Sequence, residues 1–252
     1  MGKRGLRASV AILSLALLMV ACANVQPPAV VDIQMDVPGG QAEPSPWLKL
    51  PSGPDTSLGL VLSTNSKNNR QYLQQLRQTE RQGIYELIHD EAFLVFSEAV
   101  ADPDFIPAWM GRVLHQFYND IQVYDSVEHW REHRPDLLGL VNIRYEWAGG
   151  ATTALIELHL YDTQLRPIGV AKGEGQGYIS AWSRATNMEG IIEEDYTQRH
   201  LVRVAALKQW EESLQQWISP ALGNQEHDQC IALAVAVQNV ALRKQAVLAC
   251  AS

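Results

Sequence analysis

The sharpest catalytic pattern in the sequence is His129-Trp-Arg-Glu-His133. Two histidines four residues apart lie on one side of a helix, where they can bind zinc while the glutamate acts as a general base. Zinc also needs a third protein ligand, and Pro135 ends the helix directly after the pair. The competing interpretation is a solvated short helix with Trp130 against the core. We predict no metal and no cofactor, and keep a zinc-dependent hydrolase using His129, Glu132 and His133 as an alternative.

Three other polar patterns are weaker. Gly173-Glu-Gly-Gln-Gly177 has closely spaced glycines, but a dinucleotide-binding loop needs a third glycine where Tyr178 stands. We expect a flexible strand end there. His89-Asp90-Glu91 is typical of a solvated helix end, and His159 beside Glu157 is expected on the polar face of a sheet. The sequence also contains no G-x-S-x-G nucleophile motif. We therefore predict no catalytic residue.

The first 22 residues predict export. Three basic residues precede an uncharged stretch of 14 residues, 8–21, which is too short to span a bilayer because that takes about 20 residues. Leu18-Met-Val-Ala-Cys22 resembles the lipobox of bacterial lipoproteins, in which the cysteine is acylated and becomes the new N-terminus. The resemblance implies a signal peptide over residues 1–21 and lipidation of Cys22. The alternative is cleavage after Ala23, which would release a soluble periplasmic protein.

The lipobox resemblance also implies a location. In that family, an aspartate directly after the cysteine favours retention in the inner membrane, and Ala23 stands there in this chain. We expect attachment to the periplasmic face of the outer membrane. Two or more acyl chains make such attachment stable, whereas one chain holds a protein only marginally.

Without residues 1–21 the chain is strongly acidic. It has 17 basic and 28 acidic side chains, a net charge of −11. Nucleic acids and anionic lipid headgroups bind through lysine and arginine, so we predict no nucleic-acid partner and a membrane contact made by the lipid alone.

Proline is concentrated between the lipobox and the first apolar segment. Seven of the twelve prolines and the pair Gly39-Gly40 lie before residue 55. Proline-rich segments favour extended geometry, so residues 22–56 are predicted to be a tether. The alternative is that Val30, Val31, Ile33 and Val37 dock on the domain as an irregular edge segment.

The remaining two cysteines, Cys230 and Cys250, lie in a C-terminal extension, residues 223–252. Exported cysteine pairs usually form disulfides. A single helix would separate these two by about 30 Å, whereas a disulfide needs Cα atoms about 6 Å apart. We favour a disulfide with the segment bent into two pieces, and the alternative is two free buried cysteines.

Hydrophobic spacing predicts the first half of one domain, residues 57–222. Leu58–Leu62 is predicted to be a strand and Ser63–Asn69 a turn. A helix is expected from Tyr72 to Ile88, with Gly83 as a weak point. An apolar run follows at Ala92–Phe96. The stripe from Ile106 to Phe117 predicts a helix, with Asp104 as its N-cap and Pro107 in the first turn.

The second half predicts a meander. Ile121–Tyr124 alternates like a strand, and a short helical turn is expected at 128–134. Three strands follow: in the first, Val141, Ile143, Tyr145 and Trp147 alternate with polar residues. The second strand is centred on residues 154–161 and the third runs from 168 to 178. After a polar loop, residues 201–218 predict a long helix with Trp210 and Trp217 as core residues. The fold class is α/β (α+β): a mixed sheet with an antiparallel three-strand meander covered by helices.

Residues 91–218 resemble, in order and in small motifs, periplasmic lipoprotein domains of the CsgG, LpoB and TolB N-terminal type. The matching segments are Val113–Phe117, Ile121–Tyr124, Asp136–Ile143, and Leu158–Asp162 with Pro167–Val170. The resemblance implies a strand at 92–96 before the helix. It also implies a role in secretion, wall synthesis or envelope assembly through protein contacts, and it assigns no catalytic residue.

Together these features predict a lipid-anchored periplasmic adaptor or assembly factor that binds another cell-envelope protein and has no enzymatic activity. A zinc-dependent hydrolase and a periplasmic carrier of a small ligand or lipid are the alternatives. A carrier requires an apolar cavity between the sheet and the helices.

Overall fold

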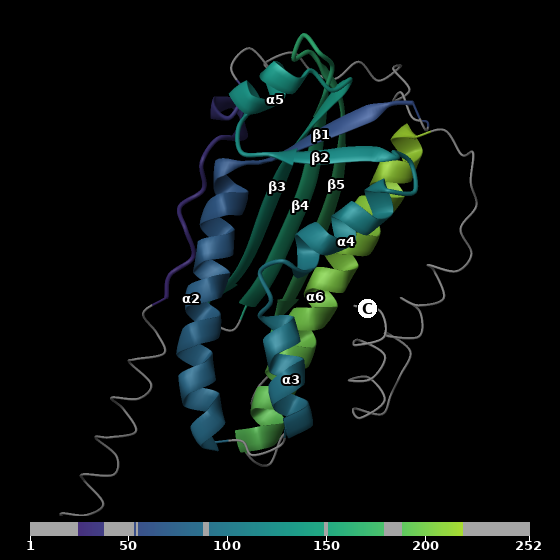
Figure 1. Cartoon of the computed structure of the whole chain (residues 1–252). Helices are drawn as coiled ribbons and strands as arrows, with labels where there is room; N and C mark the ends of the chain where they lie inside the picture. The colour runs from purple at the N-terminus through teal and green to yellow at the C-terminus, as the bar shows by residue number, and fades with distance from the viewer. Residues whose placement is uncertain are drawn as a thin grey trace, which may run out of the picture.

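The computed structural model describes residues 25–37, 53, 55–87, 91–148, 151–178 and 188–218 (Figure 1). The helical elements in chain order are η1 (Ile33–Met35), α2 (Thr64–Leu87), α3 (Glu91–Val100), α4 (Phe105–Leu114), α5 (Val127–His133) and α6 (Met188–Trp217). The strands are β1 (Ser57–Leu62), β2 (Asp120–Tyr124), β3 (Leu137–Ala148), β4 (Ala151–Tyr161) and β5 (Pro167–Tyr178). None of the helices in these ranges is long and apolar enough to cross a membrane.

The five strands form one mixed sheet in the order β2-β1-β3-β4-β5. β1 pairs in parallel with both β2 and β3, and β3, β4 and β5 form the antiparallel meander that the sequence predicts. The expected α+β fold class is therefore confirmed. β1 reaches only to Val141 along β3, so the second half of β3 has no strand beside it on that edge.

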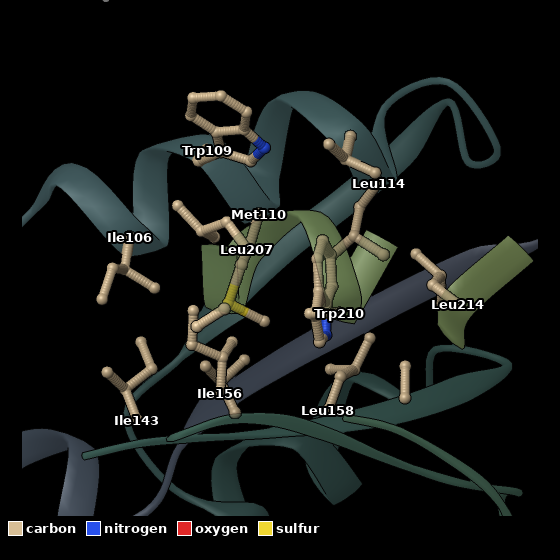
Figure 2. Close-up of a cluster of buried hydrophobic side chains, with 14 of the residues drawn as sticks. Ile106, Trp109, Met110, Leu114, Ile143, Ile156, Leu158, Leu207, Trp210 and Leu214 are labelled. Carbon is tan, nitrogen blue, oxygen red and sulfur yellow. The ribbon is translucent and has the colours of Figure 1, made fainter. Parts of the chain in front are cut away.

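The main core lies between one face of the sheet and the helices α2, α4 and α6. Figure 2 shows Met110 of α4 and Leu207 and Trp210 of α6 above Ile143, Ile156 and Leu158 of the sheet. Trp210 and Leu214 are completely buried, as the helical spacing predicts, while Trp217 is only partly buried at the margin of this core.

A smaller core occupies one end of the opposite face. Trp130 of α5 packs there with Leu138, Leu140 and Tyr161, and its ring nitrogen donates to the carbonyl oxygen of Leu137 at 3.1 Å. This confirms that Trp130 is a core residue. α5 is capped at both ends: the Ser126 hydroxyl accepts from His129 N at its start, and Arg134 ends the helix with a left-handed backbone conformation.

Residues 25–37 lie against the domain, so this part of the predicted tether is corrected and the docking alternative describes it better. Val37 is 1% exposed in the smaller core, and the backbone of Val31 makes two hydrogen bonds with the Asn65 side chain. Asp36 accepts from the backbone N–H and the hydroxyl of Thr64, which caps α2. Val30 stays exposed. Most of the remaining proline-rich segment, including residues 38–52, lies outside the described residues.

α2 covers the edge of β3 that β1 leaves open. The Ser66 hydroxyl bonds to Val141 O and Ile143 N, and the Asn69 amide bonds to both Tyr145 O and Tyr145 N. Tyr72 OH continues the series at Trp147 O. The predicted turn at Ser63–Asn69 is therefore wrong: a helix begins at Thr64, the Ser63 hydroxyl accepts from Ser66 N at its start, and the side chains of Ser66 and Asn69 bond to β3.

α6 covers β5 with unusually close contact. A Cβ atom placed on Gly173 or Gly175 would overlap the carbonyl oxygens of Ala206 and Val202, and one on Gly177 would overlap Gln198. The glycine-rich segment is therefore a packed strand and not the flexible strand end that the sequence suggested. α6 also caps the β5 edge, since Ser213 and Gln209 accept from Lys172 N and Glu174 N.

Three further expectations are corrected. Residues 92–96 belong to α3, which packs on α2 and α6 instead of entering the sheet. α6 begins at Met188, inside the expected polar loop, and farther along it Arg199 and His200 are buried; Tyr145 OH donates to Arg199 O. Asp104 occupies the N-cap position of α4 but makes no capping hydrogen bond.

Candidate functional site

The predicted metal-binding residues do come together on α5. One ligand atom from each of His129, Glu132 and His133 lies within 4.8 Å of the others, and the two imidazole rings are 4.8 Å apart. Glu132 and His133 are exposed and His129 is half-buried. His133 Nδ1 is 3.0 Å from His129 O, which leaves Nε2 as its free ligand atom. No fourth histidine, cysteine or carboxylate of the described ranges joins this cluster.

This geometry meets only part of what the hydrolase alternative needs. A zinc site of the H-x-x-E-H pattern uses both histidines as ligands and the glutamate as base, so the third ligand must come from another element. If Glu132 binds the metal instead, the cluster has no base. α5 can thus offer a shallow three-ligand site on the surface, but its described surroundings do not complete a hydrolytic centre.

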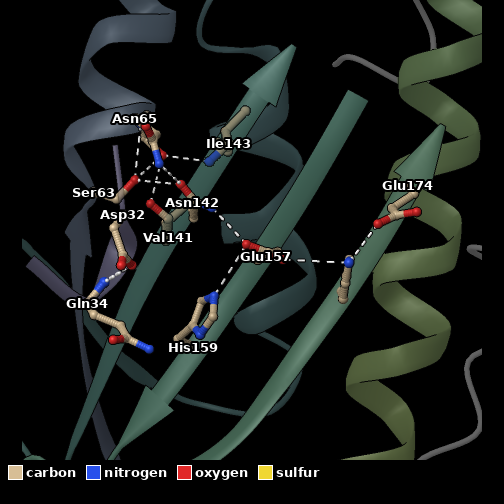
Figure 3. Close-up of polar contacts among 12 residues, drawn as sticks. Asp32, Gln34, Ser63, Asn65, Val141, Asn142, Ile143, Glu157, His159 and Glu174 are labelled. Carbon is tan, nitrogen blue, oxygen red and sulfur yellow. Dashed lines mark hydrogen bonds and ion pairs between the residues drawn. The ribbon is translucent and has the colours of Figure 1, made fainter. Parts of the chain in front are cut away.

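A second polar group lies on the open face of the meander (Figure 3). Glu157 accepts from Asn142 Nδ2 at 2.7 Å, lies 3.4 Å from His159 Nε2 and 3.9 Å from Lys172 Nζ. His159 is on the polar sheet face, as predicted. Burial raises the pKa of Glu157, but hydrogen bonds from His159 and Asn142 outweigh it, so its net pKa is lowered.

The Glu157 group is held in place by the fold. Asn142 Oδ1 accepts from Ser63 and Asn65, which ties this network to the start of α2. A carboxylate with a lowered pKa and fixed donors is suited to structure and not to proton transfer near neutral pH. We interpret this network as the polar support of the α2–β3 junction.

The third candidate is the outer edge of β2. This strand ends the sheet, and no backbone group on its outer side is hydrogen-bonded within the described part of the chain. Asp120, Gln122 and Val123 are exposed, and Val123 is 72% exposed. On one side of the strand, Gln122 links Asp120 to Tyr124 OH through two hydrogen bonds.

The other strand edges differ. α6 caps β5 and α2 caps the open half of β3, both with side chains that bond to the strand backbone. Folded proteins cover or interrupt sheet edges because unpaired backbone groups pair readily with another chain. The open β2 edge is therefore the part of this sheet where, among the described residues, backbone groups are left available for pairing.

Sequence reasoning did not find this edge. It predicted the strand at 121–124, but strand order is not visible in one sequence, and only the order makes β2 an edge. The valine at 123 beside the polar Gln122 is at most a weak sequence signal of an exposed edge strand.

Cys22, Cys230 and Cys250 lie outside the described residues, so lipidation and the disulfide stay predictions. Comparisons with protein-family models, curated proteins and solved structures find no match for this chain. The resemblance to the CsgG, LpoB and TolB type of domain likewise stays a prediction.

Proposed function

We propose that this protein is a lipid-anchored periplasmic adaptor that binds another cell-envelope protein by adding a strand of that partner to β2. The observation that carries the proposal is the open β2 edge in a sheet whose other edges are capped by helices. Strand addition is a common mode of peptide recognition, since the backbone gives affinity and alternate side chains give specificity. Lipidation at Cys22 would hold the domain at the outer membrane.

The side chains of β2 define the chemistry of the partner strand. Ile121 and Val123 present an apolar side, whereas Asp120 and Gln122 present a polar side with a negative charge. Cross-strand neighbours tend to match in polarity and to be opposite in charge. We therefore expect an extended segment with apolar residues on one side and lysine or arginine on the other, which also suits the net charge of −11 of the mature chain.

Site-specific photocrosslinking in intact cells tests this function. A photoreactive residue at Val123 should capture one envelope protein, while the same residue at Tyr178, which is 69% exposed at the end of β5, should not. Asp120→Lys should reduce the Val123 product because it reverses the charge beside the added strand. Equal capture from both positions, or capture that ignores Asp120→Lys, would contradict a β2 docking site.

The cluster on α5 supports a second candidate, a zinc-dependent hydrolase. This candidate requires stoichiometric zinc in the purified protein, lost on His133→Ala, together with hydrolytic activity lost on Glu132→Gln. The adaptor proposal expects neither. Zinc binding without hydrolysis would leave the adaptor in place and assign the cluster a structural role.

A further inference from the structure

An apolar pocket of about 320 Å³ opens between α2 and α4, on the main-core side of the sheet. Leu60, Leu73 and Ile143 contribute to its apolar walls, together with Ile106 and Met110 of α4. Its volume is at the lower end of the range for small-molecule sites, about 300 to 1,000 Å³. A single short acyl chain fits such a space, whereas a two-chain lipid does not.

A buried cation lies in the wall of this apolar pocket. Arg203 of α6 lines it and is 1% exposed. Its Nη2 donates to Ala99 O at 3.3 Å, and its Nε has no hydrogen-bond partner within the described part of the chain. Burial lowers the pKa of this guanidinium, although the charges of Tyr145 and Asp102 oppose the effect. A buried guanidinium with an unused donor costs stability unless something else bonds to it.

Two aromatic rings lie beside the Arg203 guanidinium. Its guanidinium carbon lies 4.3 Å from the Phe105 ring centre and 5.6 Å from the Tyr145 ring centre. Aromatic contact occupies the face of a guanidinium and leaves the in-plane N–H groups for an acceptor.

The remaining charges of the pocket are largely engaged. Arg70 and Asp104 form an ion pair at 2.9 Å between α2 and the start of α4. Asp102 Oδ1 accepts from Asp104 N, and His115 is at the exposed end of α4. Arg203 is thus the group in this lining that still offers a buried donor to a ligand.

We propose that this pocket binds an amphipathic anion, a single short acyl chain whose carboxylate bonds to Arg203. The apolar walls receive the chain, and the guanidinium receives the head group through charge-assisted hydrogen bonds. Ile121 and Val123 of β2 also line this pocket, so the pocket adjoins the β2 edge. Its head-group contact is Arg203 of α6 and not the β2 backbone, so octanoate binding tests the pocket without the adaptor's partner.

Titration of the mature chain carrying Cys22→Ser, which needs no detergent, tests the site with octanoate and octan-1-ol. These probes share a chain length and differ in the head group. Octanoate should bind saturably and at least about tenfold more tightly than octan-1-ol. Absence of saturable octanoate binding, or equal binding of the two probes, would overturn the proposal.

Two variants and one control locate the site. Gly111 lines the pocket, and a Cβ atom there meets nothing within 4 Å, so we expect the side chain of Gly111→Phe to enter the pocket. It should abolish binding of both probes, while Gly111→Ala retains it. Arg203→Met should reduce octanoate binding to the level of octan-1-ol. Octanoate binding that survives Gly111→Phe, or a head-group preference that survives in folded Arg203→Met, would place the ligand elsewhere.

Discussion

His200 is a buried histidine one turn before Arg203 on α6. Burial and the positive charge of Arg203 lower its pKa to about 3, so the imidazole is neutral in the folded protein at neutral pH. The unfolded chain binds a proton at this position below about pH 6.5. Stability from this group is therefore present above pH 6.5 and is lost as the pH falls below it.

This difference in proton binding predicts an acid-sensitive fold. Between pH 7.5 and pH 5 the free energy of unfolding should fall by about 2 kcal/mol from His200 alone. His200→Gln should remove that part of the pH dependence, whatever its effect on stability at pH 7.5. Urea unfolding at both pH values measures it, and a drop of equal size in wild type and variant would contradict the assignment.

Individual residues differ in how far sequence could place them. Trp130 and Trp210 could be predicted to be buried because large aromatic side chains at helical spacing mark a core face. Arg203 and His200 could not, since their burial depends on α3 and α4 packing across α6 and not on the spacing within α6. Their types indicate an exposed surface, and only tertiary packing reverses that.

At the scale of elements, the two long helices act as caps for strands. The side-chain amide of Asn69 bonds to both backbone groups of Tyr145 on β3, so substitution of Asn69 tests how much such a cap stabilises the fold. Asn69→Ala should lower the free energy of unfolding by about 2 to 4 kcal/mol, because two buried backbone groups lose their partners. Gln74→Ala on the exposed side of α2 is the control and should change stability by less than about 0.5 kcal/mol. Equal effects of the two substitutions in urea unfolding would refute the capping role.

The glycines of β5 provide a second test of an element. Gly173→Ala should destabilise the fold by about 1 to 3 kcal/mol, because its methyl group would overlap Ala206 O of α6. Gly111→Ala, in a helix with free space around it, should be neutral or stabilising by up to about 1 kcal/mol. Thermal unfolding compares them, and a neutral Gly173→Ala would show that α6 packs less closely than the structure indicates.

Strand periodicity predicted β3 and β4 well because alternation is a local property. The start of α2 was mispredicted since Ser63–Asn69 is polar and turn-like in isolation, and its bonding partners lie on β3, more than 70 residues later. The close packing of α6 on β5 could not be predicted for the same reason, because Gly173 and Gly175 indicate a flexible segment unless the position of α6 is known.

For the whole molecule, the α+β fold class follows from the order of predicted elements, whereas the open β2 edge follows from strand order, which one sequence does not contain.

Attachment to a membrane depends on the predicted lipid. We expect the wild-type protein to fractionate with membranes and Cys22→Ser to appear in the soluble periplasmic fraction. A Cys22→Ser protein that still fractionates with membranes would contradict the anchor.

Hydrogen–deuterium exchange of the domain, with and without the partner captured from Val123, is the direct test of strand addition at β2. Added backbone hydrogen bonds at an open sheet edge slow the exchange of the amides that join them. Strand addition predicts slower exchange in residues 120–124 on binding and unchanged exchange in β5, whose edge α6 already caps. Unchanged exchange in β2, with protection at another surface, would contradict binding by strand addition.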